Sequence, residues 1–146
     1  MDNLDRKIIG LLQIDGRASN AEIARQIKVS EGTVRRRARR LLNERIIRVL
    51  AIPDHEKLGY GTVALIGLQV DPDKIDAVSD ILATIREVQY VAITTGVYDI
   101  FLWVALGSTE ALGAFIRDKV GTVPGVRRTE TFVNLATKKR TFGLPM

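Results

Sequence analysis

The sequence predicts an α+β protein, with an N-terminal winged helix-turn-helix followed by a ferredoxin-like βαββαβ domain. Three segments with helical apolar spacing fill the first third, and strand-like and helix-like segments alternate in the remainder. The net charge also differs between these two parts of the chain. Residues 1–50 carry 12 Lys or Arg against 6 Asp or Glu, whereas residues 51–146 carry 10 against 11. This asymmetry favours nucleic acid or another acidic surface as the partner of the first part.

The composition excludes several classes of protein. The 146 residues are 46% hydrophobic and 27% charged, which is typical of a globular protein. The absence of Cys excludes disulfides, thiol nucleophiles and thiolate metal sites, and the one His lies in a polar linker. We therefore expect no catalytic residue, no metal and no cofactor. Without a signal-peptide pattern or an apolar run of about 18 residues, we expect a cytoplasmic protein with no membrane partner.

Three helices are predicted in the first third. The first is marked by apolar residues from Leu4 to Leu12 and ends near Gly16. The second begins after Ser19, which with Glu22 forms a capping-box pattern. The third runs from about residue 31 to 44 behind Ser30 as the N-cap. We expect its buried side to consist of Val34, Ala38, Leu41 and Leu42.

The third helix is rich in arginine, and we predict that it makes the DNA contacts. Small residues at its start allow a close approach to a groove, and arginine forks suit guanine edges or phosphates. No acid lies between Thr33 and Leu42, so the arginines gain nothing from pairing within the helix and favour a polyanion. The alternative is a solvated helix with arginine stems packed over apolar neighbours. The predicted DNA-contacting residues are Ser30, Gly32, Thr33, Arg35, Arg36, Arg37, Arg39 and Arg40.

The rest of the chain reads as alternating strands and helices. A β-branched run over 46–52 predicts a wing or exit strand, and a linker with His55 follows. The predicted strands of the second domain are 62–70, 88–94, 98–106 and 126–135, with helices over 72–85 and from 108 onward. Helices on one face leave the other face of the sheet open for a partner. Trp103 is a candidate for that open face, or alternatively for the core.

The order of short motifs resembles the Lrp/AsnC family of feast/famine transcriptional regulators. The matching stretches are Leu4-Asp5-Arg6-Lys7-Ile8-Ile9, Asp15-Gly16-Arg17, Asn20-Ala21-Glu22-Ile23-Ala24, Val29-Ser30 through Val34 with Arg37 and Leu41, Thr95-Gly96-Val97-Tyr98-Asp99 and Val123-Pro124-Gly125-Val126.

The resemblance implies a winged helix-turn-helix over 1–50, an exit strand and linker over 51–61, a RAM (regulation of amino-acid metabolism) domain over 62–138 and a tail over 139–146. One departure is Arg45, where the family usually has a helix-ending Gly. Since a left-handed cap costs Arg more than Gly, the helix end is expected to differ or extend. Arg45 would then add a phosphate contact.

The resemblance also implies an effector site for an amino acid or a similar small molecule between RAM domains. Gly96 allows close backbone approach, Asp99 can accept from an ammonium group, and Tyr98 can supply a wall or a hydroxyl. Thr129 or Thr131 can bind a carboxylate. The alternative is that residues 96–99 form only a hairpin turn, with Asp99 capping backbone amides.

We compare three possible functions of the protein. The leading hypothesis is a sequence-specific regulator that binds double-stranded DNA as a homodimer assembling to a tetramer or octamer. The second is an enzyme similar to the siroheme decarboxylases of related fold, which is disfavoured because the only His lies in the linker. The third is an architectural DNA protein with little sequence preference, which the sequence does not separate from the first.

Overall fold

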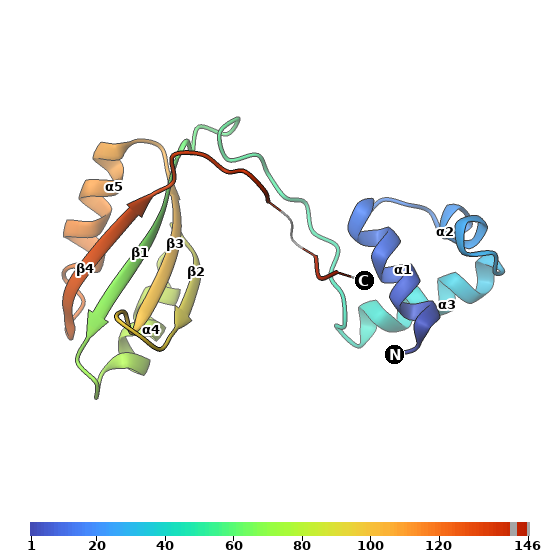
Figure 1. Cartoon of the computed structure of the whole chain (residues 1–146), viewed down its shortest axis with the longest axis horizontal. Helices are drawn as coiled ribbons and strands as arrows, with labels where there is room; N and C mark the ends of the chain where they lie inside the picture. The colour runs from blue at the N-terminus through green and yellow to red at the C-terminus, as the bar shows by residue number, and fades with distance from the viewer. Residues whose placement is uncertain (141–142, 146) are drawn as a thin grey trace. The chain divides into compact units, whose positions relative to one another are not determined.

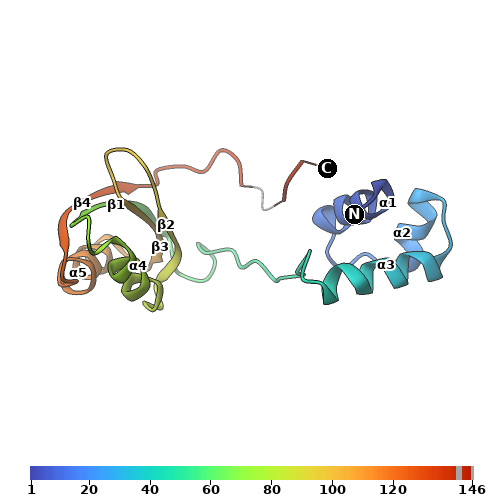
Figure 2. The ribbon, with the colours of Figure 1, turned by 90° about the horizontal axis from the view of Figure 1, so that it is seen from below.

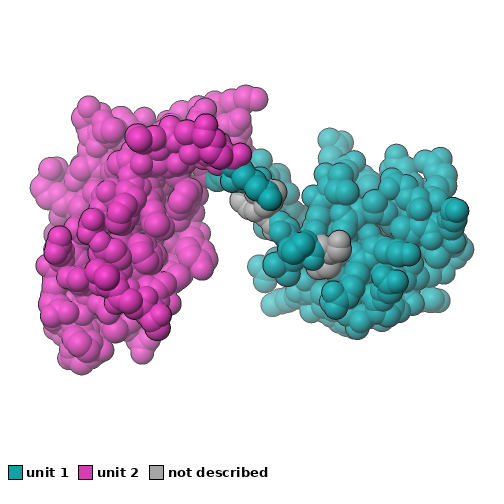
Figure 3. Space-filling view, in the orientation of Figure 1, with its two compact units in different colours: residues 1–52, 139–146 teal, residues 53–138 magenta. Residues whose placement is uncertain are grey.

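The protein forms two units, each with its own hydrophobic core. The computed structural model describes residues 1–140 and 143–145. Residues 1–52 together with 139–146 make unit 1, and residues 53–138 make unit 2 (Figure 3).

Unit 1 contains three helices, as predicted. They are α1 (Asn3–Ile14), α2 (Asn20–Ile27) and α3 (Glu31–Asn43) (Figure 1). The capping box of Ser19 and Glu22 is confirmed, and Asp2 and Asp5 form a second one at the start of α1. Leu42 was expected in the buried stripe, but its side chain is 42% exposed because it lies at the edge of that stripe. The buried core consists of Ile8, Ile9, Ile23, Ala24, Val34 and Leu41.

Arg45 closes α3 in a left-handed conformation, with φ of 55°. The Arg45 N–H donates to the Leu42 carbonyl at 3.1 Å, and the Ile46 N–H donates to the Leu41 carbonyl at 2.9 Å. These two bonds form the Schellman motif that normally ends at a glycine. The helix therefore ends at Asn43, directly before this cap, and the expected extension does not occur.

The strand predicted over residues 46–52 is wrong. Residues 47–52 have no regular secondary structure, and none of the described residues of unit 1 belongs to a strand. Ile46, Val49, Leu50 and Ile52 are between 45% and 73% exposed. A β-branched sequence becomes a strand only where another strand pairs with its backbone, and unit 1 supplies no such strand among its described residues.

Unit 2 has the predicted ferredoxin-like order of elements. Its antiparallel sheet has the strand order β2-β3-β1-β4, and the helices cover one face (Figure 2). The first helix is shorter than predicted, because a turn from Asp71 to Lys74 precedes it and a 3₁₀-like bond from Thr84 to Ile81 ends it. The elements are β1 (Thr62–Val70), α4 (Ile75–Ala83), β2 (Val88–Ile93), β3 (Ile100–Leu106), α5 (Thr109–Phe115), the π-helical η1 (Ile116–Val120) and β4 (Val126–Val133).

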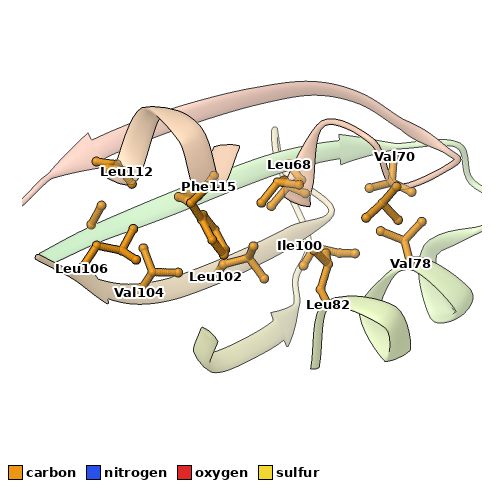
Figure 4. Close-up of a cluster of buried hydrophobic side chains, with 14 residues drawn as sticks. Leu68, Val70, Val78, Leu82, Ile100, Leu102, Val104, Leu106, Leu112 and Phe115 are labelled. Carbon is orange, nitrogen blue, oxygen red and sulfur yellow. The ribbon is translucent and has the colours of Figure 1, made fainter. Parts of the chain in front are cut away.

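The core of unit 2 lies between the sheet and its helices (Figure 4). Alternate residues of β1 and β3 point into it, including Ile66, Leu68, Ile100 and Leu102, all 0% exposed. Their neighbours, such as Leu65, Gly67 and Trp103, belong to the opposite, open face. Within the part of the chain that the structure describes, no helix is long and apolar enough to cross a membrane.

Candidate nucleic-acid interface and effector site

The turn between α2 and α3 fixes the start of the arginine-rich helix. Lys28 ends α2 in the left-handed region, with φ of 55°, and Ser30 caps α3 two residues later. The Ser30 hydroxyl accepts from the Thr33 N–H at 3.2 Å and lies 2.8 Å from the Thr33 hydroxyl. These two predicted DNA-contacting residues therefore also organise the first turn of α3.

Gly32 lies open at the start of α3. A Cβ added there would meet no described atom within 4 Å, and the backbone conformation does not require glycine. The fold itself therefore does not demand a small residue at this position. The open space is available to a partner that approaches the helix closely.

Arg37 and Arg40 point back to α1 instead of outward. One Arg37 nitrogen, Nη1, lies 2.6 Å from the Asp2 carboxylate and 3.0 Å from that of Asp5. The Arg40 Nη2 lies 2.6 Å from the other oxygen of Asp5, whose side chain is 1% exposed. The sequence shows no acid between Thr33 and Leu42 for pairing within the helix, but α1 supplies acidic partners from more than thirty residues away.

This ion-pair cluster shifts the pKa values of its members. Burial acts to raise the pKa of Asp5, but the Asp2 N–H and the Arg37 and Arg40 guanidinium groups outweigh it and hold that pKa below its ordinary value. The hydrogen bond from Arg37 lowers the pKa of Asp2 to about 2. In return, Asp2 and Asp5 raise the pKa of Arg37. The cluster is therefore fully ionised at neutral pH.

The remaining arginines form the outer surface of α3. Arg35 lies 3.7 Å from Glu31 in an exposed pair, which contributes little to stability. Within residues 1–140 and 143–145, the structure gives Arg36 and Arg39 neither an ion pair nor a side-chain hydrogen bond. Both are exposed, as are Gly32 and Asn43 on the same side of the helix. We call Gly32, Arg36, Arg39 and Asn43 the outer face of α3.

In unit 2, the loop between β2 and β3 carries the predicted effector residues. Gly96 has φ of 113°, a conformation that favours glycine. The Asp99 carbonyl accepts from the Thr94 N–H at 2.8 Å, and its carboxylate accepts from the Val70 N–H at 2.8 Å. Asp99 thus ties the loop to the end of β1, as the backbone-capping alternative expects.

Tyr98 lies over β1 on the open face of the sheet. A Cβ added to Gly67 would lie only 2.7 Å from the ring carbon Cγ of Tyr98, so the ring fills the space that a side chain at position 67 would need. Its hydroxyl donates to the Glu130 carboxylate, and this bond is the main cause of the raised pKa of Tyr98. Phe101 and Phe132 pack edge-on against the ring at centroid distances of 5.4 and 6.2 Å.

Sequence reasoning missed Glu130. The glycine within the apolar strand β1 was the available signal, because such a glycine often marks a close approach. Gly67 pairs directly with Glu130 in the sheet, so both belong to the open face.

Thr129 and Thr131 lie on the other face of the sheet. They pair with Leu68 and Ile66, whose side chains point into the helix-covered core. Within one chain the structure therefore brings Tyr98 and Glu130 together, and separates both from Thr129 and Thr131. Among the described residues, no group of three or more His, Cys, Asp or Glu side chains could hold a metal ion.

Comparison with protein families identifies both units. Residues 1–42 match the family model of the AsnC-type helix-turn-helix domain, and residues 63–144 match that of the Lrp/AsnC ligand binding domain. A relative from Pyrococcus furiosus, named as an uncharacterized HTH-type transcriptional regulator, is 41% identical over 95% of each chain. The HTH-type transcriptional regulator FL11 of Pyrococcus horikoshii is 37% identical over 100% of this chain and 97% of its own length.

Solved structures share the architecture. The structure of AsnC from Escherichia coli superposes with a TM-score of 0.88 at 31% identity, covering 97% of each chain. A transcriptional regulator of Neisseria meningitidis, solved as a complex with L-Met, has a TM-score of 0.93 at 25% identity. It covers 99% of this chain and 96% of its own.

Proposed function

The chain belongs to the Lrp/AsnC family of DNA-binding transcriptional regulators, and we propose that the outer face of α3 makes its sequence-specific DNA contacts. The observation that carries this assignment is the division of the arginines. Arg37 and Arg40 are held by the carboxylates of α1, whereas Arg36 and Arg39 point outward beside the open Gly32.

This arrangement suits the major groove. In a helix-turn-helix, the N-terminal part of the second helix reaches base edges, and flanking cations bind phosphates. Ser30, Gly32 and Thr33 lie at that end, and Arg36 follows one turn later. Arg36 is placed to bind guanine or phosphate, with Arg35 and Arg39 beside it. Arg37 and Arg40 serve mainly to hold α3 against α1. The named relatives come from archaea and bacteria, whose DNA lies in the cytoplasm, so we propose a cytoplasmic location for this protein as well.

We further propose that the protein assembles through unit 2. The open face of the sheet carries Tyr90, Trp103, Leu65 and Phe132 in neighbouring register positions. Tyr90 and Phe132 are 62% and 45% exposed, a pattern that marks an interaction surface. A homodimer would cover this face. Tetramers or octamers built from such dimers would present several copies of α3 to one DNA molecule.

The effector is proposed to be an amino acid that binds at the loop of Gly96, Tyr98 and Asp99. The support is the Lrp/AsnC ligand binding domain and the L-Met complex of the Neisseria meningitidis relative. We leave Thr129 and Thr131 out of this site, because their side chains lie on the helix-covered face.

Footprinting on genomic fragments tests the regulatory function against the architectural alternative. The protein is mixed with fragments and an excess of random-sequence DNA at physiological salt. Discrete protected half-sites, spaced by about one helical turn or a multiple of it, are the expected result. Uniform protection would assign the protein to DNA packaging instead. Failure to protect any fragment would contradict DNA binding.

A thermal-shift screen with the common amino acids, L-Met first, tests the effector. A ligand that binds only the folded state raises the melting temperature. Tyr98→Phe removes the hydroxyl bonded to Glu130 but keeps the ring over Gly67, and it should reduce the shift. Tyr60→Phe, in the exposed linker, is the matched control and should leave it unchanged. No shift with any amino acid would contradict the proposal.

A further inference from the structure

A second positively charged surface of unit 1 lies apart from the outer face of α3. It is a groove of about 1410 Å³ between α1, the segment 47–52 and the C-terminal tail. None of the described residues that line it belongs to α3. Its cations come from all three walls: Arg6 and Lys7 from α1, Arg48 from the segment, and Lys139 and Arg140 from the tail.

The tail is fixed to α1 where it forms this wall. With its amide oriented to satisfy both partners, the Gln13 side chain donates to the Leu144 carbonyl at 3.0 Å and accepts from the Leu144 N–H at 3.2 Å. Gly143 lies so close that a Cβ there would stand 2.6 Å from the Gln13 amide carbon. The tail (red in Figure 1) thereby returns to unit 1 and brings Lys139 and Arg140 to the groove.

The charge balance of this groove is one-sided. Five cations line it, and no Asp or Glu is among its described lining residues. All five cationic side chains are exposed, so they keep their hydration. A surface that gathers positive side chains in this way attracts a polyanion. The ligand chemistry that fits is a row of phosphates.

We propose that this groove binds a stretch of DNA phosphate backbone separate from the stretch that α3 contacts. The inference rests on the proposed DNA-binding function, because it assigns the same partner to a second surface. Its contacts would be independent of sequence, since phosphates carry no base information. The C-terminal tail thus becomes part of the DNA-binding surface, although it follows the ligand binding domain in the chain.

The salt dependence of binding to random-sequence duplex DNA tests this proposal. Each phosphate contact adds about 0.9 to the slope of log K against log salt, so losing two contacts lowers the slope by about 2. The full-length double variant Lys139→Gln/Arg140→Gln should show this loss on long duplexes. Arg6→Gln/Arg48→Gln, on the other two walls, should behave in the same way.

The control variant Lys57→Gln/Arg86→Gln removes two exposed positive charges from unit 2, outside the groove. It changes the net charge equally and should leave the slope unchanged. Slopes equal to wild type in both groove variants would overturn the proposal, as would a loss in the tail variant alone. If the groove variants still bind DNA with wild-type slopes, the proposed DNA contacts of α3 are unaffected. Failure of the wild-type protein to bind any duplex would instead overturn the proposed function itself.

Discussion

Among the described residues of unit 1, Asp5 is the buried charged side chain, and both of its carboxylate oxygens accept hydrogen bonds. It accepts from the Asp2 N–H at 3.0 Å and from Arg37 and Arg40 at 3.0 and 2.6 Å. Asp5→Asn keeps the shape but removes the negative charge that both guanidinium groups need. We predict a loss of about 2 kcal/mol in the free energy of unfolding, measured by urea denaturation.

Asp2→Asn is the matched control for this variant. Asp2 binds the same Arg37, but its side chain is 55% exposed, so water replaces the lost contact. It should destabilise the protein clearly less than Asp5→Asn. Equal effects of the two substitutions would show that burial of Asp5 is not what gives the cluster its strength.

The same cluster makes stability depend on acid pH. The pKa values of Asp2 and Asp5 are lowered in the folded protein, so the folded state binds these protons less readily than the unfolded state. Their contribution is fully present above the unfolded pKa of 3.8 and is lost as the pH falls through the lowered pKa values of the folded state, which for Asp2 is about 2. Urea denaturation at pH 7, 4 and 2.5 should show the loss mainly in the last step. The double variant Asp2→Asn/Asp5→Asn should show a smaller loss over that step.

Arg45 offers a stabilising substitution. Its φ of 55° costs a residue with a side chain more than it costs glycine, while glycine loses more entropy on folding. Arg45→Gly should raise the free energy of unfolding by roughly 0.5–1 kcal/mol. A lower melting temperature for this variant would contradict the left-handed cap.

Individual side chains were predictable where their partners are close in sequence. Ser19 and Glu22 are three residues apart, and their mutual bonds followed from the pattern. Arg37 and Asp5 are 32 residues apart, so helical spacing could not pair them. The role of Arg37 is decided by the packing of α1 on α3, which depends on the tertiary fold.

The packing of the 94–99 loop on β1 predicts a specific sensitivity at the level of elements. Any Cβ on Gly67 would stand 2.7 Å from the Tyr98 Cγ, close to the backbone of that residue, so the whole ring must move. We predict that Gly67→Ala destabilises unit 2 by about 1–3 kcal/mol.

Gly61→Ala is the control for this substitution, because a Cβ at Gly61 meets no described atom within 4 Å. Thermal unfolding monitored by circular dichroism distinguishes the two variants. A melting temperature for Gly67→Ala equal to that of Gly61→Ala would show that the Tyr98 ring does not rest on β1.

Strands were predictable where the sheet buries them. The run 62–70 agrees with β1 residue for residue, because a short, nearly continuous apolar run bounded by turn residues is typical of a buried strand. The run 46–52 has equally β-branched residues but no pairing partner among the described residues of unit 1. A strand also needs a neighbouring strand to pair with its backbone, and the sequence of the run alone does not show whether one is present.

For the whole molecule, the open sheet face predicts the assembly state. Phe132 and Ile81 are both 45% exposed, but Phe132 lies on the open face and Ile81 on α4. Phe132→Lys should lower the molecular mass measured by light scattering, because it places a charge in the proposed interface. Ile81→Lys should leave the mass unchanged, and equal masses for both variants would contradict assembly through this face.

We propose that α3 uses its arginines in two ways, outward to bind DNA and inward to hold the fold. The most direct measurement compares Arg36→Gln/Arg39→Gln with Arg37→Gln, recording DNA affinity at several salt concentrations together with the melting temperature. The outer pair should lose affinity and about 2 units of salt slope at an unchanged melting temperature. Arg37→Gln should lower the melting temperature. Retained affinity and slope in the Arg36→Gln/Arg39→Gln variant would contradict the account.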